Sequence, residues 1–420
     1  MTRFVGHGRT EVTAAEELTP VDEHLQAILD ALPTPDAIGL TVFDALGLVL
    51  AEDVVGQAML PAFANAAMDG YAVVAADIAG ASLDQPVELP VIGEVAAGAG
   101  APAGVPPGKS VRIMTGAPVP AGTDAVVPVE TTSGGAATAA FHRPVAAGDH
   151  IRRPGEDLQP GQVLLRSGRR VQPADVGLLT AAGVARVLCV PPPRVVVLSS
   201  GDELVPANRE PGPGQIRDSN GPMLAAMVRA AGGIPFTTGV VPDDRKALMY
   251  AFDTNLGHAD LFVCTGGASA GTRDLLPDVI GAMGEVATAK VAMKPGMPQI
   301  RGRIGGTPVI GLPGNPVSAF VSFEVFVRPA IRLLQGRRDV TRPVVTARVA
   351  EPLVGASRKR HYVRVRLTRT GSGWSATPTG AQGSHVISSI SSADGLAVVP
   401  EDRDRLEVGE SVPVQLLIEG

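Results

Sequence analysis

Four short loops in the middle of the chain carry the residue types best suited to chemistry. They read SSGDEL (199–204), GQIRDSNG (214–221), TGGASAGTRD (265–274) and GLPGNPVS (311–318). Glycine pairs let a backbone approach a ligand closely and aim its N–H groups at an anion, and helix N-termini also favour anions. A ligand that carries phosphate groups would suit these loops.

The acidic residues of the same loops indicate a metal ion. Asp202, Glu203 and Asp274 would repel a phosphate unless a hard cation lay between, and Mg²⁺ is commonly held by one or two carboxylates together with phosphate oxygens. These three residues are therefore the predicted metal ligands. Lys290 and Lys294, four residues apart in AKVAMKPGMP, would add positive charge over the same pocket.

Simpler interpretations of these residues stay open at this point. A glycine-rich loop after one strand is often only a turn. Asp202 and Glu203 could be a helix N-cap pair, and Asp243 and Asp244 are well suited to the same role. Ser269 has no histidine and carboxylate partners in the pattern, so nucleophilic catalysis is not expected. The convergence of four such loops at one sheet edge is what favours a phosphate and metal site.

The elements around these loops predict a doubly wound, mostly parallel sheet over about residues 190–335. Apolar runs typical of buried strands (RVVVLS, IPFTTGVV, DLFVCTGG, TPVIGLPG) alternate with helical patterns. One helix begins after Asp218 or Ser219 and stops at Gly232, and a long one begins at Pro316 after an Asn315 cap. In such sheets, ligands bind beyond the carboxyl ends of the strands.

The flanking segments are predicted to form separate domains, because 420 residues exceed what one core usually organises. Residues 59–148 hold short β-like runs and predict an inserted β-rich domain. Residues 340–420 alternate as strands and predict a β-barrel. Residues 15–58, with two helical patterns around Pro33 and Pro35, and residues 149–190 predict one discontinuous domain. The α/β domain then spans 191–336.

Composition excludes several classes of protein. Only 3% of the residues are aromatic, and the net charge of −6 is spread over interspersed acids and bases, so no nucleic-acid partner is expected. Cys189 and Cys264 lie in apolar runs without metal-site spacing, which predicts inert thiols in a reduced compartment. No signal-like stretch or run of 18 apolar residues occurs, so a cytoplasmic protein without a membrane partner is expected.

The chain resembles the MoeA family of molybdopterin molybdenumtransferases, whose gephyrin relatives share the same domain. The resemblance rests on the central loops and on PAFANAAMDGYAV (61–73), RIMTGAPVPAGTDAVVPVE (112–130), RRPGEDLQPGQVLL (152–165) and GSHVISSISSADGLAVVPE (383–401). It implies a four-domain subunit whose 15–58 and 149–190 segments serve dimerisation, and a homodimer. It also implies an enzyme that inserts molybdate into adenylyl-molybdopterin with Mg²⁺, releases AMP and forms molybdenum cofactor.

The resemblance carries the family's functional positions onto residues of this chain. The implied catalytic residues are Asp69, Thr115, Asp157, Glu203, Asp274, Lys290 and Lys294. The implied ligand-binding residues are Gly266, Gly267, Ser269, Gly271, Pro313, Gly314, Asn315, Pro316 and Ser318, with either Asp243 or Asp244. In this family the inserted domain of one subunit closes over the central domain of the other. One departure is Met297, because many relatives have a lysine there.

Two other functions compete with this one. An adenylyltransferase that makes the AMP adduct from ATP shares the central domain, but the extra β domains speak against it. A scaffold protein is the second, because fused animal relatives cluster membrane receptors, but no long linker is seen here. The expected partners are molybdate, adenylyl-molybdopterin and a second copy of the chain, with the adenylyltransferase and molybdoenzymes as further candidates.

Overall fold

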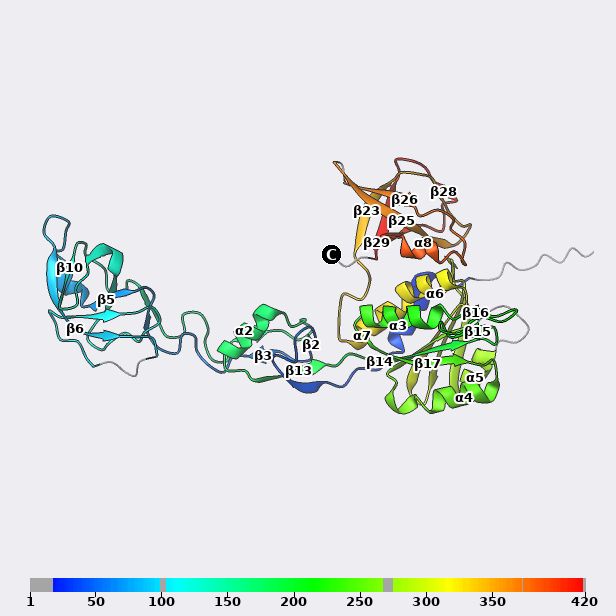
Figure 1. Ribbon diagram of the computed structural model, residues 1–420, viewed down its shortest axis with the longest axis horizontal. Coiled ribbons are helices and arrows are strands. Elements are labelled where there is room, and N and C mark those ends of the chain that lie inside the picture. Colours follow the sequence, from blue (N-terminus) through cyan, green and yellow to red (C-terminus); the bar gives the residue numbers. More distant parts are fainter. Residues whose placement is uncertain (1–17, 99–102, 267–274, 372, 418–420) are drawn as a thin grey trace, which may run out of the picture. The chain divides into compact units, whose positions relative to one another are not determined.

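The computed structural model describes residues 18–98, 103–266, 275–371 and 373–417 (Figure 1). Its contacts divide the chain into two compact units. Ile38–Cys189 forms one unit, and the described residues on either side of it form the other. Each unit is treated by itself below. In the described residues, no helix is long and apolar enough to cross a membrane.

A six-stranded sheet forms the centre of the unit that contains the glycine-rich loops. Its strand order is β17-β14-β18-β22-β21-β19. The first four strands are parallel: β17 (Ile234–Val241), β14 (Arg194–Ser200), β18 (Leu261–Thr265) and β22 (Thr307–Leu312). This confirms the predicted doubly wound, mostly parallel sheet.

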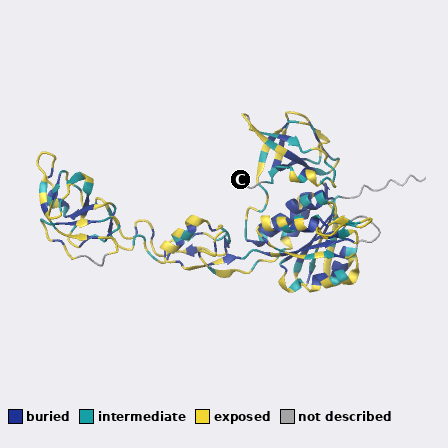
Figure 2. Cartoon of the chain, viewed as in Figure 1, coloured by how far each residue is buried: buried dark blue, intermediate teal, exposed yellow. Residues whose placement is uncertain are grey.

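Helices cover both faces of this sheet because alternate strand residues point to opposite sides. Val195 and Val197 pack with α1 (Val21–Asp30), α3 (Asn220–Ala230) and the helix that starts at Pro316. Val196 and Leu198 face the other way, toward α4 (Arg245–Asp253) and α5 (Leu275–Met283). Figure 1 shows α3 and α7 on one side of the sheet and α4 and α5 on the other, and the strands between them are the buried layer in Figure 2.

The edge of the sheet beyond β22 was not predicted from the sequence. β19 (Gly284–Lys290) and β21 (Pro298–Ile304) pair antiparallel to each other, and β21 pairs antiparallel to β22. β19 is mostly exposed, so its sequence lacks the apolar run that marks the buried strands. The sheet is therefore mixed, and the segment with both predicted lysines connects these two edge strands.

The predicted long helix after Asn315 is present but irregular. It consists of α6 (Pro316–Ser322), a π-helical turn η4 (Phe323–Val327) and α7 (Arg328–Leu334), with Asn315 at the N-cap and Pro316 in the first turn. Pro329 lacks an N–H group and cannot continue the regular hydrogen-bond ladder. A π-helical turn immediately before this proline accommodates the missing bond.

The unit formed by Ile38–Cys189 contains two small β structures. The prediction of two helical patterns in residues 15–58 was half wrong: the described part of that range, from residue 18 on, has one helix, α1, which belongs to the other unit, and β1 (Ile38–Thr41) pairs antiparallel with β13 (Arg186–Val190). Pairing with a distant strand overrode the local helical pattern. The same part holds β2 (Val49–Leu50), β3 (Val54–Val55), β12 (Val163–Leu165) and α2 (Pro173–Ala181).

The inserted segment forms a six-stranded sheet of order β8-β5-β7-β6-β10-β9. The strands are β5 (Gly70–Val73), β6 (Val87–Val95), β7 (Ser110–Ile113), β8 (Ala125–Pro128), β9 (Thr132–Ser133) and β10 (Thr138–Phe141). A separate pair joins β4 (Asn65–Ala66) to β11 (Ile151–Arg152), and the short helices are η1 (Ala75–Ile78) and η2 (Val129–Thr131).

The C-terminal strands close into a five-stranded β-barrel, as the sequence predicts. The barrel runs β25 (Arg360–Thr370), β26 (Gly373–Pro378), β23 (Val344–Val349), β29 (Ser411–Leu416) and β27 (Gly395–Val399), and β27 pairs back to β25. The remaining elements are η3 (Leu256–His258), β15 (Leu204–Val205), β16 (Ile216–Arg217), β20 (Met293–Lys294), β24 (Leu353–Val354), α8 (Ser388–Ser391) and β28 (Arg405–Leu406). β20 extends the barrel by pairing parallel with β25.

Candidate active site

A pocket of about 550 Å³ lies at the carboxyl ends of β14, β18 and β22. Its walls come from the loops that the sequence singled out, together with Pro298 at the start of β21 and His385 of the C-terminal domain. The lining residues are Ser200, Glu203, Leu204, Ile216, Arg217, Asp218, Ser219, Asn220, Thr265, Gly266, Pro298, Pro313, Gly314, Asn315, Pro316, Ser318 and His385. The structure therefore brings together loops that are more than a hundred residues apart in the sequence.

Gly266 fixes the contact between two of these loops. Its φ angle is +94°, a region that side chains disfavour, and a Cβ atom there would lie 2.0 Å from the carbonyl oxygen of Ser200. Only glycine fits this position. The predicted residues Gly267, Ser269, Gly271 and Asp274 follow directly and lie outside the described residues.

Asn220, at the start of α3, connects three walls of the pocket. Its Nδ2 donates to Thr265 Oγ1 at 3.0 Å and to the Gly314 carbonyl at 2.7 Å, while Thr265 Oγ1 donates to the Pro313 carbonyl. Its Oδ1 is buried and has no hydrogen-bond partner among the described residues. Sequence reasoning placed Asn220 in a loop but missed this role, because its partners come from two distant strands.

The two adjacent acids Asp243 and Asp244 have different surroundings. Asp244 caps α4, because its Oδ1 accepts the N–H of Ala247 at 2.9 Å. Asp243 instead accepts a hydrogen bond from Ser200 Oγ at the end of β14, and its own N–H donates to Asp202 Oδ1 at 3.1 Å. Of the two, Asp243 is the one joined to a pocket-lining residue.

The remaining acids of the pocket offer hard oxygen ligands. Glu203 is exposed and lines the pocket, while Asp218 is buried and accepts the N–H of Gly221 at 3.0 Å. No group of three His, Cys, Asp or Glu side chains in the described part of the chain is arranged to hold a metal. Carboxylates at separate positions nevertheless fit Mg²⁺, which keeps several waters and takes one or two protein ligands together with phosphate oxygens.

The two predicted lysines lie at the end of β19 and in the segment that follows it. Lys290 ends β19, and the exposed Lys294 ends β20. Burial, together with the charges of Lys294 and Arg364, lowers the pKa of His361, the strand partner of Lys294, to about 4. Both cations therefore lie near His361, on the two strands β20 and β25 that pair with each other.

Arg364 supports one wall of the pocket, and sequence reasoning missed it. It is fully buried, and its guanidinium donates to Ser389 Oγ at 3.1 Å and to the Gly383 carbonyl at 3.1 Å. It thus holds the loop that carries His385 into the pocket. The structure describes no hydrogen-bond partner for its Nη1. An arginine in an apolar strand, RVRL, was the available signal.

The predicted residues of the other unit form a small site of their own. The N–H and Oγ1–H of Thr115 both donate to Asp69 Oδ1 at 2.7 Å. Both bonds lower the pKa of the Asp69 carboxyl, and the bond from the backbone N–H has the larger effect. The sequence placed the two residues 46 positions apart, and folding joins β5 to β7. Asp157 lies in an exposed turn, where its N–H donates to the Leu60 carbonyl at 2.9 Å.

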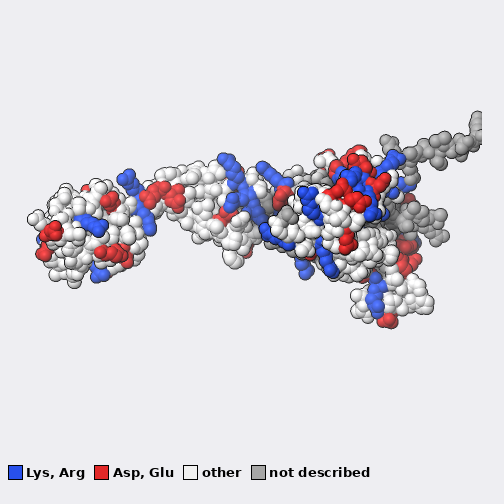
Figure 3. All heavy atoms as spheres, turned by 90° about the horizontal axis from the view of Figure 1, so that it is seen from above, with Lys and Arg blue, Asp and Glu red and all other residues white. Residues whose placement is uncertain are grey.

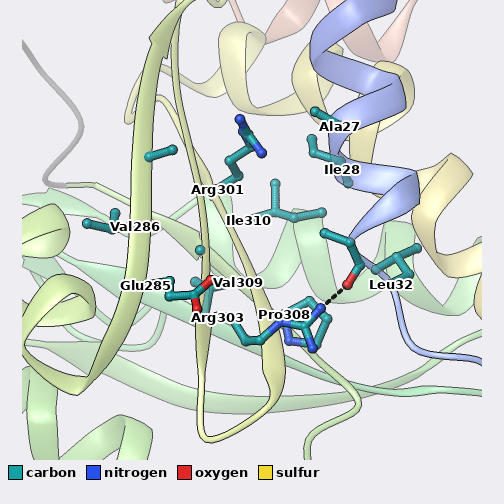
Figure 4. A pocket seen from close by; sticks show the side chains of 13 residues that line it. Ala27, Ile28, Leu32, Glu285, Val286, Arg301, Arg303, Pro308, Val309 and Ile310 are labelled. Atoms are coloured by element: carbon teal, nitrogen blue, oxygen red, sulfur yellow. Dashed lines mark hydrogen bonds between the residues drawn. The ribbon is translucent and has the colours of Figure 1, made fainter.

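A second cavity, of about 220 Å³, lies between α1 and the antiparallel edge of the sheet (Figure 4). Figure 4 shows Arg303 reaching across it to the Ala31 carbonyl, to which it donates a hydrogen bond. Its other lining side chains are mostly apolar, and none of the predicted site residues is among them. Its chemistry does not match the predicted ligand.

Three family descriptions together match almost all of the chain. Residues 19–183 match the "MoeA N-terminal region (domain I and II)", residues 196–333 the "Probable molybdopterin binding domain", and residues 346–417 the "MoeA C-terminal region (domain IV)". The chain belongs to the MoeA family.

Relatives of this MoeA protein agree over nearly their whole length. Molybdopterin molybdenumtransferase 2 of Mycobacterium tuberculosis is 41% identical over 400 residues, which cover 94% of this chain and 98% of the relative. Molybdopterin molybdenumtransferase of Staphylococcus aureus is 31% identical over 398 residues, covering 94% and 95%. The crystal structure of the molybdopterin biosynthesis MoeA protein from Pyrococcus horikosii superposes with a TM-score of 0.84 at 33% identity, covering 96% and 100%.

Proposed function

We propose that this MoeA protein is a molybdopterin molybdenumtransferase that inserts molybdate into adenylyl-molybdopterin and releases AMP. The supporting observation is the pocket at the carboxyl ends of β14, β18 and β22, which combines the backbone at Gly266 and Gly314 with the side chains of Glu203, Asp218 and Arg217. The names of the relatives support the reaction class. On the face drawn in Figure 3, acidic and basic side chains both occur throughout, which fits a small-molecule substrate better than a polyanion.

In this proposal, some residues bind the substrate and others neutralise its charge. The backbone at Gly266 and the helix start at Asn315 hold the pyrophosphate, because N–H groups at such positions favour anions. Asp202, Glu203, Asp243 and Asp274 are the acids that would hold Mg²⁺ directly or through water, and the bound ion would neutralise charge as the phosphoanhydride bond breaks. Lys294 holds the molybdate oxyanion. No protein nucleophile is required.

Substitution of Lys294 tests the proposed position of the molybdate oxyanion. Molybdate carries two negative charges and must sit beside a phosphate, and Met297 supplies no cation where many relatives have lysine. Lys294→Ala should raise the molybdate concentration for half-maximal turnover by at least roughly tenfold, about 1.4 kcal/mol. Binding of the nucleotide adduct should change less, and Met297→Lys should shift the molybdate dependence in the opposite direction. An unchanged molybdate dependence in Lys294→Ala would place the anion elsewhere.

The Asp69–Thr115 site belongs to the same reaction if the protein works as a homodimer in which each inserted domain completes the partner's pocket. We expect Asp69→Ala and Glu203→Ala each to lose at least roughly nine tenths of the turnover as pure dimers. Randomly mixed chains are half heterodimers with one intact pocket of two, so mixing should restore about a quarter of the wild-type turnover. Turnover that stays at the level of the parents, despite demonstrated subunit exchange, would argue for a pocket within one chain.

An assay with two sets of substrates distinguishes the proposed function from the competing adenylyltransferase function. Purified protein would be given either adenylyl-molybdopterin with molybdate or molybdopterin with ATP, and AMP and pyrophosphate would be followed. The proposed function predicts AMP in the first reaction and no pyrophosphate in the second. Pyrophosphate release from ATP would instead support adenylyl transfer. A cytoplasmic location remains a prediction, which fractionation of cells would test.

A further inference from the structure

A buried glutamine lies beneath the turn that carries Lys294. Gln299, at the start of β21, is 1% exposed. Its Nε2 donates to the Gly296 carbonyl at 2.6 Å and to Ser322 Oγ at 2.7 Å, and both hydrogen bonds are buried. A buried amide that satisfies a turn carbonyl is costly to remove, because the carbonyl then loses its partner away from water.

The turn itself has little freedom to move. Gly296 has a φ angle of +100°, and a Cβ atom there would lie 2.6 Å from Ser322 Oγ. The N–H of Val291 donates to the Met297 carbonyl at 2.7 Å, which closes the loop on itself. Every residue from 291 to 296 is buried except Lys294. The loop is therefore fixed on all sides and exposes a single cation.

The barrel holds the same loop from the other side. Met293 and Lys294 pair in parallel with Arg360 and His361, and the N–H of Arg360 donates to the Ala292 carbonyl at 2.9 Å. Among the described residues, none forms a hydrogen bond or ion pair with the Lys294 ammonium. A lysine that only faced water would gain nothing from such a fixed support, whereas one that binds an anion gains from being held in place.

From this geometry we infer that Gln299 is a positioning residue: its amide holds the Lys294–Gly296 turn so that the Lys294 ammonium meets the molybdate oxyanion. The inference rests on the proposed function, in which Lys294 binds that anion. Gln299 does not line the pocket, and it acts through the turn.

The chain provides a matched control for this role. Gln335 is also a buried glutamine whose Nε2 donates to a turn carbonyl, that of Ala231 at 2.8 Å, beside a glycine with a φ angle of +93°, Gly232. This second turn leads into the amino end of β17, away from the pocket. Methionine at either position keeps much of the volume and removes the donor.

The test compares Gln299→Met with Gln335→Met in the full-length protein. Both should lose similar thermal stability. Only Gln299→Met should raise the half-saturating molybdate concentration, by about tenfold, with kcat changed by less than about threefold. Titration with molybdate in a calorimeter should show the same weakening without turnover, and amide hydrogen exchange of residues 291–299 should rise in Gln299→Met alone.

The outcomes separate this inference from the proposed function. Equal molybdate dependence in Gln299→Met and Gln335→Met, in a protein where Lys294→Ala does weaken molybdate, would overturn the role of Gln299. Unchanged exchange over residues 291–299 in Gln299→Met would overturn it as well. If Lys294→Ala has no effect while exchange rises in Gln299→Met, the turn is held as described and the placement of the anion is what fails.

Discussion

Gly266→Ala should abolish most of the turnover, lowering it by at least about 100-fold, because a displacement near 1 Å at a reacting centre is enough for such a loss. The new Cβ would lie 2.0 Å from the Ser200 carbonyl, so the ends of β14 and β18 must move apart. Ser200 donates to Asp243, so one of the acids of the pocket moves with it. The strained φ should also lower the free energy of unfolding by roughly 1–3 kcal/mol.

Gly306→Ala is the control for backbone strain alone. Gly306 has a φ angle of +88° with nothing within 4 Å of an added Cβ, and it lies in the turn between β21 and β22. It should lose comparable stability in chemical unfolding and keep its turnover. Wild-type turnover in Gly266→Ala, or an equal loss in both variants, would contradict the assigned role of Gly266.

Removal of divalent metal should stop the reaction. Glu203 and Asp218 line a pocket that must accept at least two phosphates, and Asp202 lies next to Glu203 in the chain. The repulsion between two like unit charges about 4 Å apart near a protein surface is of the order of 4 kcal/mol. A pocket whose negative charge is not compensated by a cation would therefore bind the substrate poorly. In excess chelator, turnover should fall below about one hundredth, and added Mg²⁺ should restore it.

The thermal unfolding temperature distinguishes a metal that acts in the reaction from a metal that supports the fold. Because Asp202 and Glu203 are exposed, the thermal unfolding temperature should stay unchanged in chelator. Full turnover without divalent ions would remove Mg²⁺ from the account. A large drop in unfolding temperature would instead indicate a metal that supports the fold.

The parts of the fold that the sequence predicted well share one physical property. The buried parallel strands are continuous apolar runs between helical patterns, so their positions are encoded locally, as in RVVVLS before SSGDEL. The exposed strand β19 carries no such run, and the strands after Pro35 are fixed by pairing with β13, about 150 residues away. Non-local pairing is what the local pattern cannot show.

The residues of the candidate site were also predicted only in part from the sequence. Glycine-rich loops after strands and the helix start at Asn315 are visible in the sequence because their residue types have few other uses. The roles of Asn220, Arg364 and Gln299 were missed, because each acts through hydrogen bonds to distant backbone carbonyls. The choice between Asp243 and Asp244 likewise required the structure, which shows one of them capping a helix.

The most direct test of the central claim is the ratio of molybdenum inserted to AMP released in a single turnover. Purified protein loaded with adenylyl-molybdopterin would be mixed with molybdate and Mg²⁺, and both AMP and the molybdenum bound to the released pterin would be quantified. The proposed reaction predicts one molybdenum for each AMP, and little AMP when molybdate is left out. AMP released at the same rate without molybdate, or with no molybdenum on the pterin, would show a hydrolase and contradict the proposed transfer.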